Sequence, residues 1–137
     1  MAYDVHYFFE RGQRSAEESL SSLVQGLRDA GVDAGTAQMS RGTDWPEALD
    51  WVSGELTSGG RETGINIEIH TDDMSVNLGW ESVADSPGAP ARPANLGTCT
   101  LTLVGDIDWG TFESVRTVLR DLWAAAEYDS ADGFTNR

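Results

Sequence analysis

The 137-residue sequence predicts an α+β two-layer sandwich, in which three helices pack on one face of a mostly antiparallel sheet of about four strands. Two observations predict this class. Apolar and polar residues alternate at 65–70 and 74–81, as in half-buried strands, and apolar residues recur at helical spacing at 16–30 and after residue 108. The length is typical of one domain, which we expect over 1–128.

The first part of the chain predicts a strand, then a helix. Residues 2–10 alternate between two faces and are expected to form a strand. Ser15 and Glu18 form a capping box, which predicts a helix over about 16–30. A short edge strand is expected near 36–40, where the apolar residues are too small to specify a central strand.

The middle of the chain predicts a helix and then a hairpin. Asp44 can cap a helix, and the apolar residues that follow have helical spacing up to Ser58. Strands are expected at 65–70 and 74–81, joined by a turn at 71–73. Because one face of this hairpin is apolar and the other polar, we expect one face on a core and the other in water.

The last part predicts a loop, a strand and a helix. Residues 82–97 contain three prolines, and we expect a mobile loop there. A strand is expected at 98–104, and a broad apolar stripe predicts a final helix that begins near Asp108. Residues 129–137 are expected to form a polar tail.

The charge of the chain excludes several classes of partner. There are 23 acidic residues, nine arginines and no lysine, which gives a net charge of −14. This charge argues against binding to nucleic acid or to an anionic membrane surface. The single cysteine allows no internal disulfide, and the start of the sequence does not resemble a signal peptide. We therefore expect a cytoplasmic protein.

The acidity has two interpretations that the sequence leaves open. Residues 32–85 contain eleven acidic residues and two arginines, a net charge of −9, and so form an acidic middle segment. This segment could steer association with a basic protein. Alternatively, the acidity could be an adaptation to molar salt, as in haloarchaea, because salt at that concentration screens the repulsion between like charges.

Two groups of residues could hold a divalent metal. If the first strand joins the hairpin sheet, His6 lies on the same face as Glu68 and His70, and this set could bind zinc or iron. Asp106 and Asp108 could instead hold magnesium. Each group also has a purely structural interpretation, since Asp108 can cap the final helix and the histidines can simply be solvated. No other cofactor is expected.

The remaining candidates are surface residues that could contact a partner. Trp51 lies off the apolar stripe of its predicted helix, and Phe8 lies on the polar side of the first strand, so both could be interface residues. The acidic residues expected beside them are Asp44, Glu47, Asp50 and Glu55.

Three functions remain open at this stage. The first is a non-catalytic interaction module, such as an inhibitor or immunity-type protein for a basic partner, because the sequence contains none of the common catalytic motifs. The second is a structural or accessory protein adapted to salt. The third is a small metal-dependent enzyme that uses one of the two metal groups above.

Overall fold

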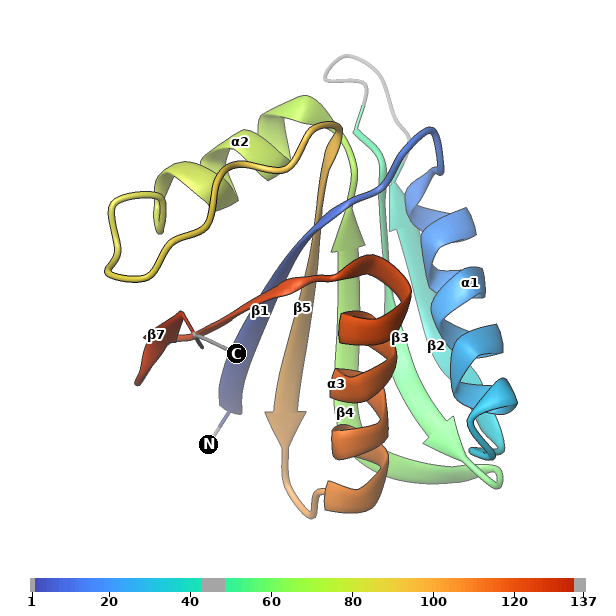
Figure 1. Ribbon diagram of the computed structural model, residues 1–137. Helices are drawn as coiled ribbons and strands as arrows, with labels where there is room; N and C mark the ends of the chain where they lie inside the picture. Colours follow the sequence, from blue (N-terminus) through green and yellow to red (C-terminus); the bar gives the residue numbers. More distant parts are fainter. Residues whose placement is uncertain (1, 43–48, 135–137) are drawn as a thin grey trace.

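The computed structural model describes residues 2–42 and 49–134 and contains one large sheet with helices on both of its faces (Figure 1). The elements in chain order are β1 (Ala2–Glu10), α1 (Ala16–Asp29), β2 (Ala34–Gly42), β3 (Trp51–Ser58), β4 (Arg61–His70), α2 (Asp73–Glu81), β5 (Leu96–Val104), α3 (Trp109–Trp123), β6 (Ala126–Asp129) and β7 (Gly133–Phe134).

All strand pairs are antiparallel, and the order across the sheet is β2-β3-β4-β5-β1-β6-β7. β1 therefore lies inside the sheet, although it begins the chain. The structure is α+β, but the prediction of about four strands is wrong, since the described chain has seven in one sheet. β2 lies at one end of the sheet, which agrees with the edge strand expected near 36–40.

The larger core lies between the sheet and the helices α1 and α3, which both cover one face (Figure 1). The capping box at the start of α1 is confirmed, because Ser15 and Glu18 each accept a hydrogen bond from the other's backbone N–H. The sheet side of this core is apolar because alternate residues of each strand point towards the helices. Its central residues are Ile65, Ile67, Ile69, Leu101, Leu103, Leu23, Leu27, Val115 and Leu119.

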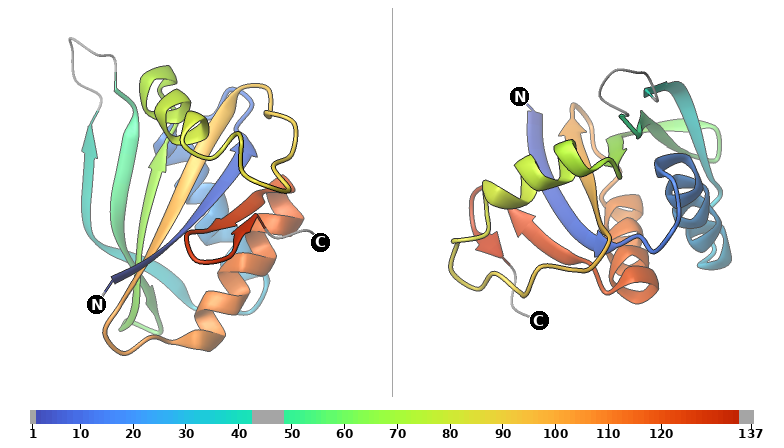
Figure 2. Two further views of the ribbon diagram at one scale, coloured as in Figure 1. Left: turned by 90° about the vertical axis from the view of Figure 1, so that its left-hand side faces the viewer. Right: turned by 90° about the horizontal axis from the view of Figure 1, so that it is seen from above.

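A second, smaller core lies on the opposite face, where α2 packs over one end of the sheet (Figure 2). Three helices on one face were predicted, and this is wrong for α2. Phe8 points away from α1 and α3, and its ring makes an edge-to-face contact with Trp80 at a centroid distance of 5.3 Å. The buried residues of this second core are Phe8, Val76, Trp80, Val83, Leu96 and Phe134.

The segment predicted to be a helix from Asp44 to Ser58 contains β3 instead. Residues 43–48 of this prediction lie outside the described residues, but Trp51–Ser58 is a strand that pairs with both β2 and β4. Val52 and Leu56 point into the larger core, and Gly54 is the inward position between them. The four-residue spacing of Val52 and Leu56 therefore comes from a strand whose middle inward position lacks a side chain.

The second strand of the predicted hairpin, 74–81, is the helix α2. Asp72 caps it by accepting a hydrogen bond from the Ser75 N–H at 2.9 Å. Val76 and Trp80 are four residues apart and both pack towards the sheet, whereas Leu78 is 64% exposed. The alternation of apolar residues in this segment is thus not a sign of a strand.

The segments expected to be a loop and a polar tail are partly packed. The loop between α2 and β5 ends before Leu96, where β5 begins, and its residue Val83 is buried in the second core. In the part of the predicted tail that the structure describes, Gly133–Phe134 forms β7 and the side chain of Phe134 is buried.

Candidate functional site

Within the described part of the chain, no helix covers the face of the sheet opposite α1 and α3 beyond the end where α2 packs (Figure 2). Because successive side chains of a strand point to opposite faces, the strand register aligns the outward side chains in rows across the sheet. We call two of these rows the open face. One row contains Ser40, Ser53, Glu68, Thr100, His6 and Tyr128, and the next contains Ala37, Glu55, Asn66, Thr102 and Asp4.

The structure confirms that the histidines lie on one face with their neighbouring carboxylates, as the sequence predicts. β5 lies between β1 and β4, so Thr100 stands between His6 and Glu68 in the row. His6 and Glu68 are therefore two strands apart, roughly 10 Å between strand axes. His6 Nδ1 makes a 2.9 Å hydrogen bond with the Thr100 hydroxyl instead.

The predicted metal ligands His6, Glu68 and His70 are consequently not brought together. Glu68 and His70 contact each other through Oε1 and Nε2, while His6 is held by Thr100. Among the residues that the structure describes, no three His, Cys, Asp or Glu side chains are grouped closely enough to hold a metal ion.

Two carboxylates of the open face are positioned by their neighbours. The hydrogen bond from His70 lowers the pKa of Glu68, which keeps this carboxyl in its charged form. Asp4 accepts a 2.8 Å hydrogen bond from the Thr102 hydroxyl. Both side chains are thus ordered before any partner arrives, which reduces the entropy lost on binding.

The predicted partner-binding residues are divided between the surface and the interior. Glu55 belongs to the open face, and Trp51 lies half-buried beside it, with its ring 6.3 Å from that of His70. An aromatic residue on the polar side of β1 can either contact a partner or pack under a second layer; Phe8 does the latter, since it is only 3% exposed and is covered by α2, so it is not a contact residue.

The acidic residues predicted beside Trp51 do not form one patch in the described structure. The carboxylate of Asp50 accepts a hydrogen bond from the Ala16 N–H at 3.1 Å and contacts the Thr71 hydroxyl. It thereby ties the start of α1 to the turn after β4. Asp44 and Glu47 lie outside the described residues.

The open face carries charge of one sign. Its charged residues are Asp4, Glu55 and Glu68, and no arginine belongs to either row. Arg41 follows Ser40 on β2, but it points to the helix side of the sheet, where it pairs with Glu17 of α1 at 2.7 Å. A cationic partner would therefore meet no repulsive charge from these two rows.

The other residues that the sequence singled out have structural roles. Asp108 caps α3 and accepts hydrogen bonds from the Thr111 N–H and hydroxyl, which lower the pKa of its carboxyl. Asp106 is exposed in the preceding turn. Cys99 is fully buried, and burial raises the pKa of its thiol, so the thiol stays protonated in the core.

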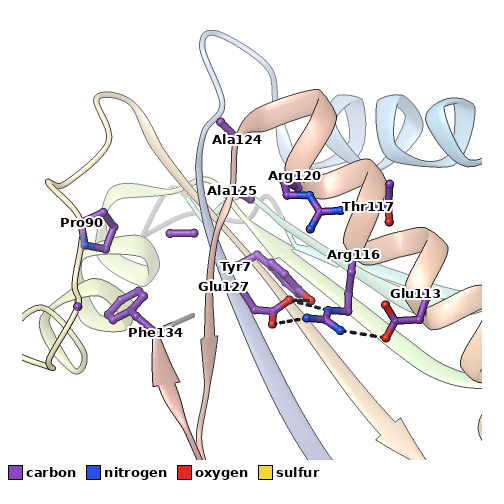
Figure 3. A pocket seen from close by; sticks show the side chains of 12 residues that line it. Tyr7, Pro90, Glu113, Arg116, Thr117, Arg120, Ala124, Ala125, Glu127 and Phe134 are labelled. Carbon is purple, nitrogen blue, oxygen red and sulfur yellow. Dashed lines mark hydrogen bonds and ion pairs between the residues drawn. The ribbon is translucent and has the colours of Figure 1, made fainter. Parts of the chain in front are cut away.

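Sequence reasoning missed a cavity of about 670 Å³ beside α3 and β6 (Figure 3). At its floor, Glu127 accepts a 2.7 Å hydrogen bond from the Tyr7 hydroxyl and two from Arg116, at 2.9 and 3.0 Å. Arg116 also binds Glu113 at 2.9 Å. The helical spacing of Glu113 and Arg116 was visible in the sequence, but β6, which contributes Glu127, had not been predicted.

Comparison with known proteins does not assign this chain to a family. No protein-family model matches it, and neither the curated proteins nor the solved structures contain a match. Among the described helices, none is both long enough and apolar enough to span a membrane.

Proposed function

We propose that this protein is a non-catalytic interaction module that binds a basic protein through the open face, as an inhibitor or immunity-type protein would. The observation that carries the proposal is the sign of the charge on this face: Asp4, Glu55 and Glu68 extend over three strands, and no arginine interrupts them.

The charge of the whole chain supports the same proposal. A net charge of −14 creates a field that attracts a basic protein from a distance and raises its association rate. At short range, the side chains that hold Asp4 and Glu68 keep two carboxylates ordered, and the hydrogen bond from His70 lowers the pKa of Glu68. Trp51 offers half-buried aromatic surface in the row next to that of Glu68, and aromatic residues are frequent in interfaces.

Two variants with the same net charge test the proposal. One removes the carboxylates of the open face (D4N, E55Q and E68Q), and the other removes three exposed carboxylates elsewhere (D33N, D106N and D121N). The probe is a fluorescein-labelled peptide of nine arginines, followed by fluorescence anisotropy. We expect the first variant to weaken binding about tenfold and the second by less than about threefold. Equal losses would show that only net charge matters and would overturn the proposal.

Thermal unfolding distinguishes this proposal from the alternative, in which the acidity is an adaptation to salt. If the acidity serves binding, circular dichroism will show a folded protein at low salt that gains little stability from molar KCl. If the chain unfolds at low salt and folds only in molar KCl, the acidity is an adaptation to salt and the interaction proposal loses its main support.

A further inference from the structure

The cavity beside α3 and β6 has two different sides (Figure 3). Arg116, Thr117 and Arg120 of α3 form one side. Across β6, the other side is made by Pro90 from the loop before β5 and by Phe134 of β7. Small side chains from the segment Ala124, Ala125 and Ala126 lie between the two sides and leave the space open.

The charged groups at the floor of this cavity form one network, in which one guanidinium meets two carboxylates. Arg116 donates to both Glu127 and Glu113, and these bonds raise the pKa of its guanidinium. Tyr7 donates to the same Glu127 carboxylate. The floor is therefore a completed network that contributes shape and rigidity. With one guanidinium and two carboxylates it has a net charge of −1 and offers no unpaired cation to an anionic ligand, so the cation for such a ligand must come from elsewhere in the lining.

Arg120, unlike Arg116, is only weakly paired with a carboxylate. Its Nε lies 3.9 Å from the Asp121 carboxylate, and both side chains are more than half exposed. This separation is too long for a hydrogen bond, and exposed pairs of this kind contribute little energy. In the cavity lining, Arg120 is thus the cation with the weakest counter-ion, and Figure 3 shows its guanidinium on the cavity side of α3 near Thr117.

We propose that this cavity binds a small organic anion with a flat apolar body. The anionic group is bound by Arg120 and the hydroxyl of Thr117, and the apolar body lies on the alanines against Pro90 and Phe134. The volume of about 670 Å³ is that of a small-molecule site. Arg120 and Thr117 lie on α3, on the side of the sheet opposite the acidic rows, whereas the far side of the cavity reaches the open face at Phe134, which packs against Tyr128.

Two fluorescent probes that differ in charge test this inference. 8-Anilinonaphthalene-1-sulfonate carries a flat apolar body and an anionic group, and N-phenyl-1-naphthylamine has a similar body without the charge. We expect R120Q to weaken binding of the sulfonate about fivefold and to leave binding of the uncharged probe unchanged. The matched control is R61Q, since Arg61 is exposed and lies outside the cavity; it should change neither affinity.

A third variant locates the binding site. Thr117 is exposed on α3, so T117W should fold normally while its indole reduces the space in the cavity. We expect it to weaken both probes. The inference is overturned if the wild-type protein does not bind the sulfonate, if R120Q and R61Q bind it equally, or if T117W binds both probes as the wild type does.

Discussion

At the scale of single residues, Gly64 shows how closely the end of the sheet is packed. It lies in β4 where the pairing with β3 shifts register, and its φ is +75°. A Cβ at this position would lie 2.7 Å from the Asp106 carbonyl oxygen and 2.8 Å from that of Val104. Both the backbone conformation and the space therefore require glycine.

Replacing Gly64 by alanine should destabilise the protein by about 3 kcal/mol, because a left-handed conformation and a clash with backbone are added together. Gly105 provides the matched control, since its φ is +71° but no atom lies within 4 Å of a Cβ placed there. G105A should cost only about 1 kcal/mol. Urea unfolding measures both values, and equal losses would contradict the packing described for Gly64.

Tyr7 is expected to make stability fall at alkaline pH. Burial and the hydrogen bond to Glu127 raise the pKa of the Tyr7 hydroxyl above its ordinary value of 10. Above pH 10 the unfolded chain loses this proton while the folded protein keeps it, so the free energy of unfolding decreases as pH rises.

The variant Y7F isolates this effect. Below pH 9 it should be less stable than the wild type by about 1 kcal/mol, because a buried hydrogen bond is lost. Above pH 10 the difference should shrink, since the variant has no hydroxyl at this position to titrate. Urea unfolding at several pH values between 8 and 11.5 measures it. A difference that stays constant with pH would contradict the buried environment of Tyr7.

At the scale of elements, α2 depends on Asp72. One oxygen of this carboxylate accepts from the Ser75 N–H at 2.9 Å, and the other accepts from the Asp50 N–H at 3.1 Å. Burial raises the pKa of Asp72, but the hydrogen bonds from Ser75 and Asp50 outweigh it and the net pKa is lowered. Asp72 thus links the start of α2 to the start of β3.

D72A should destabilise the protein by about 2 kcal/mol at pH 7, because a helix cap and a bond to a second element are both lost. The stability that Asp72 provides is present above pH 4 and is lost as pH falls through its lowered pKa. The cost of D72A should therefore decrease at pH 3, and thermal unfolding at the two pH values tests this. The same cost at both pH values would show that the charged form of Asp72 is not what stabilises α2.

Two segments were predicted with the wrong secondary structure: β3 was expected to be part of a helix and α2 to be a strand. In β3 the strand alternation is hidden at Gly54, because the side chain of Met39 occupies the place where a Cβ would point. In α2 the alternation of apolar residues is real, but Met74 and Leu78 are exposed while the sheet-facing residues have helical spacing. Long-range packing on Phe8 decides the second case, and the sequence does not reveal it.

At the scale of the whole molecule, it was easier to predict which side chains of a strand share a face of the sheet than to predict which strands pair with each other. Alternation within β1 and β4 correctly placed Asp4, His6, Glu68 and His70 on one face. The same pattern did not show that β5 lies between these strands, and this one fact separates the expected metal ligands. The cavity was missed for a similar reason, since it depends on β6 and on where the loop before β5 passes.

The whole molecule also separates its possible functions in space. α1 and α3 cover one face with the larger core, α2 covers one end of the other face, and the open face occupies the rest (Figure 2). The acidic residues of the open face and Arg120 of the cavity therefore lie on opposite sides of the sheet, although Tyr128 of the open face packs against Phe134 of the cavity. Substitutions of Asp4, Glu55 or Glu68 are expected to leave binding in the cavity unchanged, since residues that share no contacts are usually additive.

The most direct test of the account is to locate the binding surface of a basic probe. Two-dimensional ¹H–¹⁵N NMR spectra of the full chain, recorded during titration with the nine-arginine peptide, report on each backbone amide. We expect the largest shift changes in β1, β3, β4 and β5 around Asp4, Glu55 and Glu68, and we expect them to diminish with added salt. Changes spread evenly over the acidic surface, or concentrated on α1 and α3, would contradict binding through the open face.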